Sequence, residues 1–119
     1  MPDSICQTVI ARSAAFVPQA TRRPGIRERV LLSREQCPHQ NVVLLDLDAG
    51  AQVDQTPAPT SESLYVLEGS VEIRTAEWAS VLGKGELCHL ASGTLHGLRP
   101  VGGPAQILAI FAPPNEAKS

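Results

Sequence analysis

Frequent turn residues are the feature that most constrains what this chain can fold into. Ten prolines and nine glycines are spread over 119 residues, and the apolar runs between them are short. The helical spacing of apolar residues fails after Leu32, and Pro38 opposes a helix across the segment that follows. Short strands separated by regularly spaced turns are typical of sandwiches and barrels. The pattern therefore predicts an all-β fold.

Individual segments support this prediction. Residues 71–75 alternate between apolar and polar side chains, which places Val71 and Ile73 on one face of a sheet. The apolar runs on either side of the polar segment 33–40 predict a hairpin. Further strands are expected in four other apolar runs, at 63–67, 78–82, 87–90 and 105–111.

The length of the chain predicts one domain. We expect an N-terminal arm over residues 1–25, a barrel over 26–113 and a flexible tail over 114–119. Within the arm, residues 5–10 are a candidate strand, which could pair with a second copy of the chain.

Composition excludes several classes of function. Only 3% of residues are aromatic while 43% are hydrophobic, so the core must be mostly aliphatic, and Trp78 is expected in that core or at a dimer interface. A net charge of −2 argues against nucleic-acid binding by phosphate neutralisation. No apolar run is long enough for a membrane span or a signal peptide. Cys6, Cys37 and Cys88 form an odd set without C-x-x-C spacing, which favours a reduced, cytoplasmic chain.

Two spaced motifs resemble those of the cupin superfamily. The first family motif is G-x5-H-x-H-x3,4-E-x6-G, and Gly50, Glu62 and Gly69 match it in spacing. Thr56 and Ala58 stand where the two histidines belong. The second motif is G-x5-P-x-G-x2-H-x3-N. Its matching residues here are Gly85, Gly93 and His96, while Ala91 replaces the proline and Pro100 the asparagine.

The resemblance implies a double-stranded β-helix, the cupin or jelly-roll barrel, and commonly a homodimer in which N-terminal strands join the partner's sheet. It also implies a metal site of three imidazoles and one carboxylate, of which this chain keeps only His96 and Glu62. Thr56 is a poor neutral ligand and Ala58 offers no donor. We therefore expect no metal or other cofactor. The alternative is a transition metal held weakly by His96 and Glu62.

His96 is the best candidate for a catalytic or ligand-binding group, because an interior imidazole can act as base, proton donor or hydrogen-bonding group. Glu62 is expected either to pair with His96 or to face water, since an unpaired buried carboxylate is costly. Cys88 is expected to be a buried apolar residue with His89 on the opposite face of its strand. Cys37-Pro38-His39 is interpreted as a solvated turn. The pocket candidates are His96, Glu62, Thr56, Tyr65 and His89.

These observations leave three hypotheses about function. The first is a barrel that binds an unidentified small molecule in a concave apolar pocket with a depleted metal site. The second is an enzyme of the oxygenase or isomerase type, using a metal or acid–base chemistry at His96 and Glu62. The third is a structural subunit that acts through dimerisation.

Overall fold

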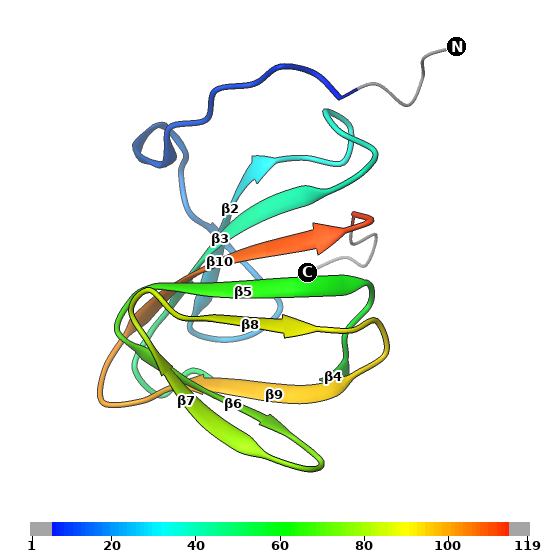
Figure 1. The fold of residues 1–119 in the computed structure, drawn as a ribbon. Helices are drawn as coiled ribbons and strands as arrows, with labels where there is room; N and C mark the ends of the chain where they lie inside the picture. Colours follow the sequence, from blue (N-terminus) through cyan, green and yellow to red (C-terminus); the bar gives the residue numbers. More distant parts are fainter. Residues whose placement is uncertain (1–5, 115–119) are drawn as a thin grey trace.

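The prediction of an all-β fold is confirmed. Figure 1 shows a computed structural model, in which residues 6–114 are described. The described residues contain no α-helix, only the short 3-10 helix η1 (Ser13–Ala15). The strands are β1 (Gln19–Ala20), β2 (Ile26–Leu32), β3 (Asn41–Leu47), β4 (Val53–Pro57), β5 (Ser61–Glu68), β6 (Ser70–Thr75), β7 (Ala79–Gly83), β8 (Leu87–Leu90), β9 (Leu95–Pro100) and β10 (Ala105–Ala112).

The strands form two antiparallel sheets. One contains six strands in the order β1-β2-β3-β10-β5-β8, and the other contains four in the order β4-β9-β6-β7. The predicted hairpin is confirmed as β2 and β3. After β3 the chain crosses repeatedly between the sheets, so strands far apart in sequence become neighbours, as β3 and β10 do (Figure 1). This crossing brings residues from both spaced motifs into one interior.

An aliphatic core fills the space between the sheets, as the composition predicts. Period-two alternation directs Leu64 and Val66 of β5 inward, together with Val71 and Ile73 of β6, and each is at most 1% exposed. Ile107 of β10 completes this layer at 0% exposure. Trp78 does not belong to the core: it precedes β7 and is 46% exposed. The assignment of Trp78 to the core was wrong because the apolar run begins in the turn before the strand, and its alternative place at a dimer interface stays a prediction.

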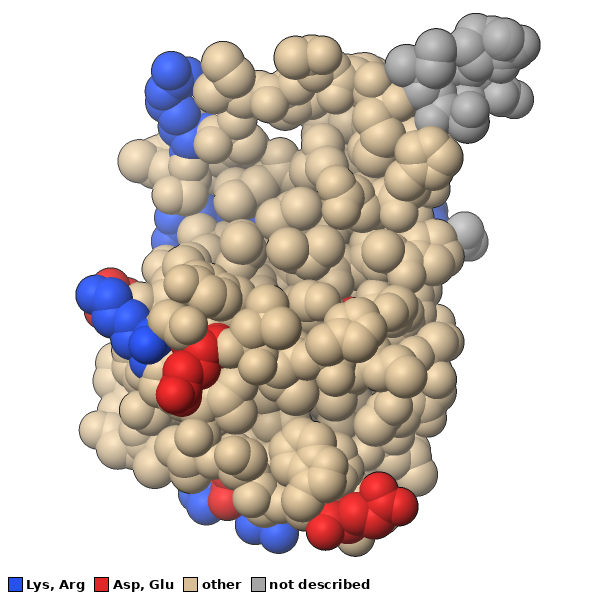
Figure 2. Space-filling view, viewed as in Figure 1, with Lys and Arg blue, Asp and Glu red and all other residues tan. Residues whose placement is uncertain are grey.

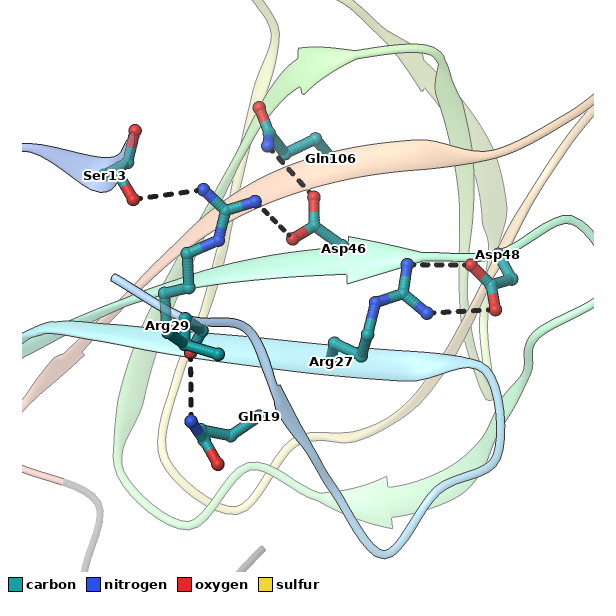
Figure 3. Close-up of polar contacts among 8 residues, drawn as sticks. Ser13, Gln19, Arg27, Arg29, Asp46, Asp48 and Gln106 are labelled. Carbon is teal, nitrogen blue, oxygen red and sulfur yellow. Dashed lines mark hydrogen bonds and ion pairs between the residues drawn. The ribbon is translucent and has the colours of Figure 1, made fainter. Parts of the chain in front are cut away.

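The N-terminal arm contacts the rest of the molecule through the pairing of β1 with β2 and through side chains. The Arg29 guanidinium donates hydrogen bonds to the Ser13 carbonyl and to the Asp46 carboxylate, at 3.2 and 2.9 Å (Figure 3). Asp46 also accepts a hydrogen bond of 3.0 Å from Gln106. A disulfide also joins Cys6 of the arm to Cys37, in the segment between β2 and β3.

The disulfide corrects the expectation of three reduced cysteines, since only Cys88 is free among the cysteines of the described range. No local pattern indicates that two cysteines with a sequence separation of 31 would pair. A cytoplasmic location was inferred from cysteine usage, so it loses that support and stays a prediction.

The candidate strand at residues 5–10 is wrong for the described part, residues 6–10, which contain no strand. Instead, β1 pairs with β2 of the same chain, Gln19 opposite Glu28. Ile5 and residues 115–119 of the predicted tail lie outside the described residues. The division into arm, barrel and tail, and the homodimer, stay predictions.

Charged side chains do not gather into one basic surface on the face shown in Figure 2. Lysine, arginine, aspartate and glutamate lie mainly near its margins, and most of the surface comes from other residue types. Among residues 6–114, no helix has the length and apolar character that crossing a membrane requires.

Candidate functional site

His96 lies in the barrel interior, on β9. Alternation along β9 turns His96 and Leu98 inward and Arg99 outward, and His96 is only 3% exposed. In the four-stranded sheet its cross-strand neighbours are Thr56 on β4 and Thr75 on β6. Directly opposite residues share a face, so both threonines flank the imidazole. Thr56 therefore lies beside His96, as the two motifs imply.

One hydrogen bond assigns the tautomer of the imidazole. Nδ1 of His96 lies 3.1 Å from the carbonyl oxygen of Thr94. A carbonyl oxygen can only accept, so Nδ1 carries the proton. In the neutral ring, Nε2 then keeps its lone pair. This leaves an imidazole nitrogen that can accept a proton or a hydrogen bond within the interior.

Glu62 enters the same interior from the six-stranded sheet. It lies on β5 and is 7% exposed, and its cross-strand neighbours are Leu90 on β8 and Phe111 on β10. Burial among these apolar side chains raises the pKa of Glu62, and the positive charges of His96 and Arg23 only partly oppose this effect. The carboxyl therefore holds its proton to a higher pH than an ordinary glutamate does.

His96 and Glu62 face each other without a direct bond. Among residues 6–114, neither a hydrogen bond nor an ion pair joins their side chains, although a positive charge on His96 lowers the pKa of Glu62. Of the two alternatives expected for Glu62, exposure to water is wrong, and pairing with His96 holds only as an electrostatic interaction without a direct bond. A third interior group, Cys88, lies on β8 next to this pair. Burial, and then the charge of Glu62, raises the pKa of the Cys88 thiol, which keeps it protonated and a poor nucleophile.

The donor groups do not fit a transition-metal centre. Such a site needs at least three firm nitrogen, sulfur or carboxylate ligands. No group of three or more histidine, cysteine, aspartate or glutamate side chains in the described part of the chain could hold an ion. His96 and Glu62 bring one imidazole and one carboxyl, and Thr56 adds only a neutral hydroxyl. No chemistry that depends on a resident metal follows from this set.

Two predicted pocket residues lie outside the barrel. Tyr65 alternates with the inward Leu64 and Val66, and it is 36% exposed on the outer face of the six-stranded sheet. His89 lies on that same outer face, where its ring nitrogens are 3.0 and 2.9 Å from the hydroxyls of Ser61 and Ser63. Assigning them to the pocket was wrong, because strand register places each on the opposite face. The prediction that Cys88 and His89 point in opposite directions is confirmed.

Sequence reasoning missed Arg23 and Thr75. Arg23 lies in the turn before β2, yet its charge acts on Glu62, some forty positions later in the chain. Nothing in the basic segment at 22–29 distinguishes Arg23 from its neighbours. Thr75 could have been found by pairing the alternating 71–75 segment with the strand that carries His96.

Solved structures decide the fold. A cupin described as RmlC-like, from Shewanella frigidimarina, matches with a TM-score of 0.80 over 94% of this chain and 97% of its own, at 18% identity. The chain has the cupin fold. The predicted double-stranded β-helix is thereby confirmed.

Other cupin-fold structures match equally well. KdgF from a Halomonas species matches with a TM-score of 0.78 at 19% identity, over 88% of this chain and 94% of its own. The polyketide cyclase RemF from Streptomyces resistomycificus gives 0.81 at 15% identity, over 93% and 83%. No protein-family model and no curated protein matches the sequence. At these identities the likeness concerns the fold alone.

Proposed function

We propose that this cupin-fold chain binds a small organic molecule inside the barrel, where His96 and Glu62 make the polar contacts. The observation that carries the proposal is a buried imidazole whose Nε2 is not engaged by the Thr94 hydrogen bond, facing a buried carboxyl. In an otherwise apolar pocket, a few polar groups orient and select a ligand. Neither group is among the fully buried side-chain atoms that lack a hydrogen-bond partner in the described residues.

The two groups define the polar part of such a ligand. Nε2 of His96 would accept a hydrogen bond from a hydroxyl or amine of the ligand. Glu62, which favours its protonated form more than an ordinary glutamate, would donate to a carbonyl or hydroxyl oxygen. The core that surrounds the two groups is aliphatic, which favours a ligand with an apolar part that packs against it. Structural neighbours named as a polyketide cyclase and an ectoine synthase support a small organic ligand.

An acid–base enzyme of the isomerase type is the second candidate. Its support is that the interior holds a group favouring its protonated form, Glu62, opposite one with a free lone pair, His96. Two titratable groups whose environments separate their protonation states can act as acid and base. On this hypothesis His96 would take a proton from the substrate while Glu62 supplies one to an oxygen. A purely structural, dimeric subunit is the remaining alternative.

Two variants of His96 test the binding proposal. The side-chain amide of asparagine can occupy the position of Nδ1 and donate to the Thr94 carbonyl, but it has no group at the position of Nε2. His96→Asn should therefore keep most of the stability that His96→Ala loses, about 1–3 kcal/mol. Both should abolish binding of any ligand that uses Nε2.

The readout is thermal stabilisation across a panel of small hydroxylated and carbonyl compounds. A ligand at a hundred times its Kd stabilises the folded chain by about 2.7 kcal/mol. A hit on the natural chain that disappears in His96→Asn supports the proposal. A hit that survives in that variant, or the lack of any hit across the panel, overturns it. Turnover of a hit that His96→Asn abolishes would establish the enzymatic alternative.

A further inference from the structure

A groove lies on the outer face of the four-stranded sheet, on the opposite side of β9 from His96. Its volume is about 440 Å³, and it is open to solvent along one side. The side chains that line it come from β4, β6 and β9 and include Asp54, Gln55, Glu72, Arg74 and Arg99. Gly97 forms part of its floor. None of these residues belongs to the interior site.

The sequence builds this hollow with a glycine and a bulge. Gly97 pairs directly with Arg74 on β6, so no side chain fills the position beside that guanidinium. On the other side, β4 shifts register between Val53 and Thr56, which leaves Asp54 and Gln55 out of the regular pairing. A Cβ on Gly97 would lie 2.9 Å from the Val53 carbonyl oxygen. Glycine is thus what allows the bulge to pass this close to β9.

Two arginines share one carboxylate at the β6 side of the groove. Glu72 accepts a hydrogen bond of 2.9 Å from Nε of Arg99 and one of 3.3 Å from Nη2 of Arg74. The hydrogen bond from Arg99 is the main reason that the pKa of Glu72 is lowered, so Glu72 stays ionised and holds both guanidinium groups in place.

The two guanidinium groups keep most of their hydrogen-bonding capacity. Each uses one nitrogen on Glu72, and their side chains are 57% and 53% exposed for Arg74 and Arg99. A guanidinium presents five N–H donors in a planar fork that matches a carboxylate. Glu72 balances only one of the two positive charges, so this side of the groove favours a further carboxylate.

The β4 side of the groove carries a negative charge and hydrogen-bond acceptors. Asp54 accepts a hydrogen bond of 2.9 Å from the Gln52 amide through one carboxylate oxygen. Its other oxygen can accept a hydrogen bond, and the amide of Gln55, which also lines the groove, can accept or donate one. A second carboxylate would be repelled at Asp54, whereas hydroxyl groups would be accepted.

We propose that the groove binds a small polyhydroxylated carboxylate, a sugar-acid type of molecule. Its carboxylate bridges Arg74 and Arg99, and its hydroxyl groups bond to Asp54 and Gln55. The site is independent of the interior His96 and Glu62.

Three compounds of equal chain length test the proposal: gluconate, hexanoate and sorbitol. Gluconate carries both features, hexanoate only the carboxylate and sorbitol only the hydroxyl groups. Binding is followed by amide chemical shifts of uniformly labelled protein, with the Gly97 amide as reporter. Gluconate should shift Gly97 saturably and bind at least tenfold more tightly than the other two. Arg74→Gln and Arg99→Gln should each weaken it about tenfold, the loss of one charge-assisted hydrogen bond.

Arg27→Gln is the matched control, because Arg27 is an exposed arginine paired with Asp48 on the other sheet. It should leave gluconate binding unchanged. Equal affinity for gluconate and hexanoate would overturn the part assigned to Asp54 and Gln55. Unchanged binding in both groove variants, or no saturable shift at Gly97, would overturn the whole proposal. His96→Asn should not affect this titration, so failure here is distinct from failure of the interior site.

Discussion

Glu62 of β5 lies directly opposite Phe111 of β10, so a carboxyl group is buried against an aromatic ring. Leu90 flanks it on the other side, from β8. This pairing accounts for the raised pKa of Glu62, because neither neighbour can stabilise a negative charge. The chain therefore keeps an acidic group where an apolar residue would pack more favourably, which is the pattern expected of a functional site.

Glu62→Gln should stabilise the protein at neutral pH. The folded chain holds the Glu62 proton more tightly than the unfolded chain, so stability falls as pH rises from about the ordinary value of 4.5 through the higher folded pKa. Glutamine removes that loss, which amounts to about 1.4 kcal/mol for each pH unit between the two pKa values. Urea unfolding at pH 7 and pH 4 measures it. The gain should be present at pH 7 and absent at pH 4.

The measurement at pH 4 is the control for this prediction. Other groups also titrate there, so the quantity compared is the difference between the natural chain and Glu62→Gln at each pH. If the natural chain were more stable than the variant at pH 7, the fold would stabilise the ionised form of Glu62. The pKa of this carboxyl would then be lowered in the folded protein, and the prediction would be wrong.

Two arginine–aspartate pairs, both with the arginine on β2, should differ in their contribution to stability. Arg29 and Asp46 have side chains 18% and 19% exposed, and Asp46 also accepts from Gln106. Arg27 and Asp48 are 42% and 52% exposed (Figure 3). Asp46→Ala should cost roughly 2–3 kcal/mol because it leaves a partly buried guanidinium without its counter-charge. Asp48→Ala should cost much less than Asp46→Ala, because water and salt screen the exposed pair. Equal losses in chemical denaturation would contradict this ranking.

The Cys6–Cys37 disulfide should be evident from thiol counts. In denaturant, the natural chain should label at one cysteine, Cys88, before reduction and at all three after reduction. Cys6→Ala should lower the free energy of unfolding by about 3 kcal/mol, because the bond constrains a long loop in the unfolded chain. Cys88→Ala is the matched control, which keeps the bond. Three labelled cysteines in the unreduced, freshly purified protein would show that the bond is not formed.

The fold could be predicted from local patterns, because the alternation in residues 71–75 and the glycine spacings depend only on residues close together in the sequence. The interior pair could also be predicted, because His96 and Glu62 occupy motif positions. Tyr65 and His89 could not be placed, because a strand's two faces differ by one residue of register, and register depends on partners distant in sequence. The groove was missed for a related reason: Arg74, Gly97 and Asp54 meet only through strand pairing.

Gly50 and Gly69 open and close the first motif, and alanine should affect them unequally. Both have positive φ, +85° and +79°, so alanine is strained at either position. At Gly50 nothing lies within 4 Å of an added Cβ, whereas at Gly69 it would lie 2.5 Å from the Pro104 carbonyl oxygen and 3.0 Å from Cα of Ala105. Gly50→Ala should therefore cost about 1–2 kcal/mol from backbone strain alone.

Gly69→Ala adds a steric clash that backbone atoms cannot easily relieve, so the loss should exceed about 3 kcal/mol. The difference arises because Gly69 follows β5 and approaches the residues that lead into β10. Urea unfolding of both variants measures it, with the slope of the transition confirming that the unfolded state is unchanged. If the two losses were equal, only the backbone conformation would require glycine at position 69, and the close approach to Pro104 would add nothing to the loss of stability.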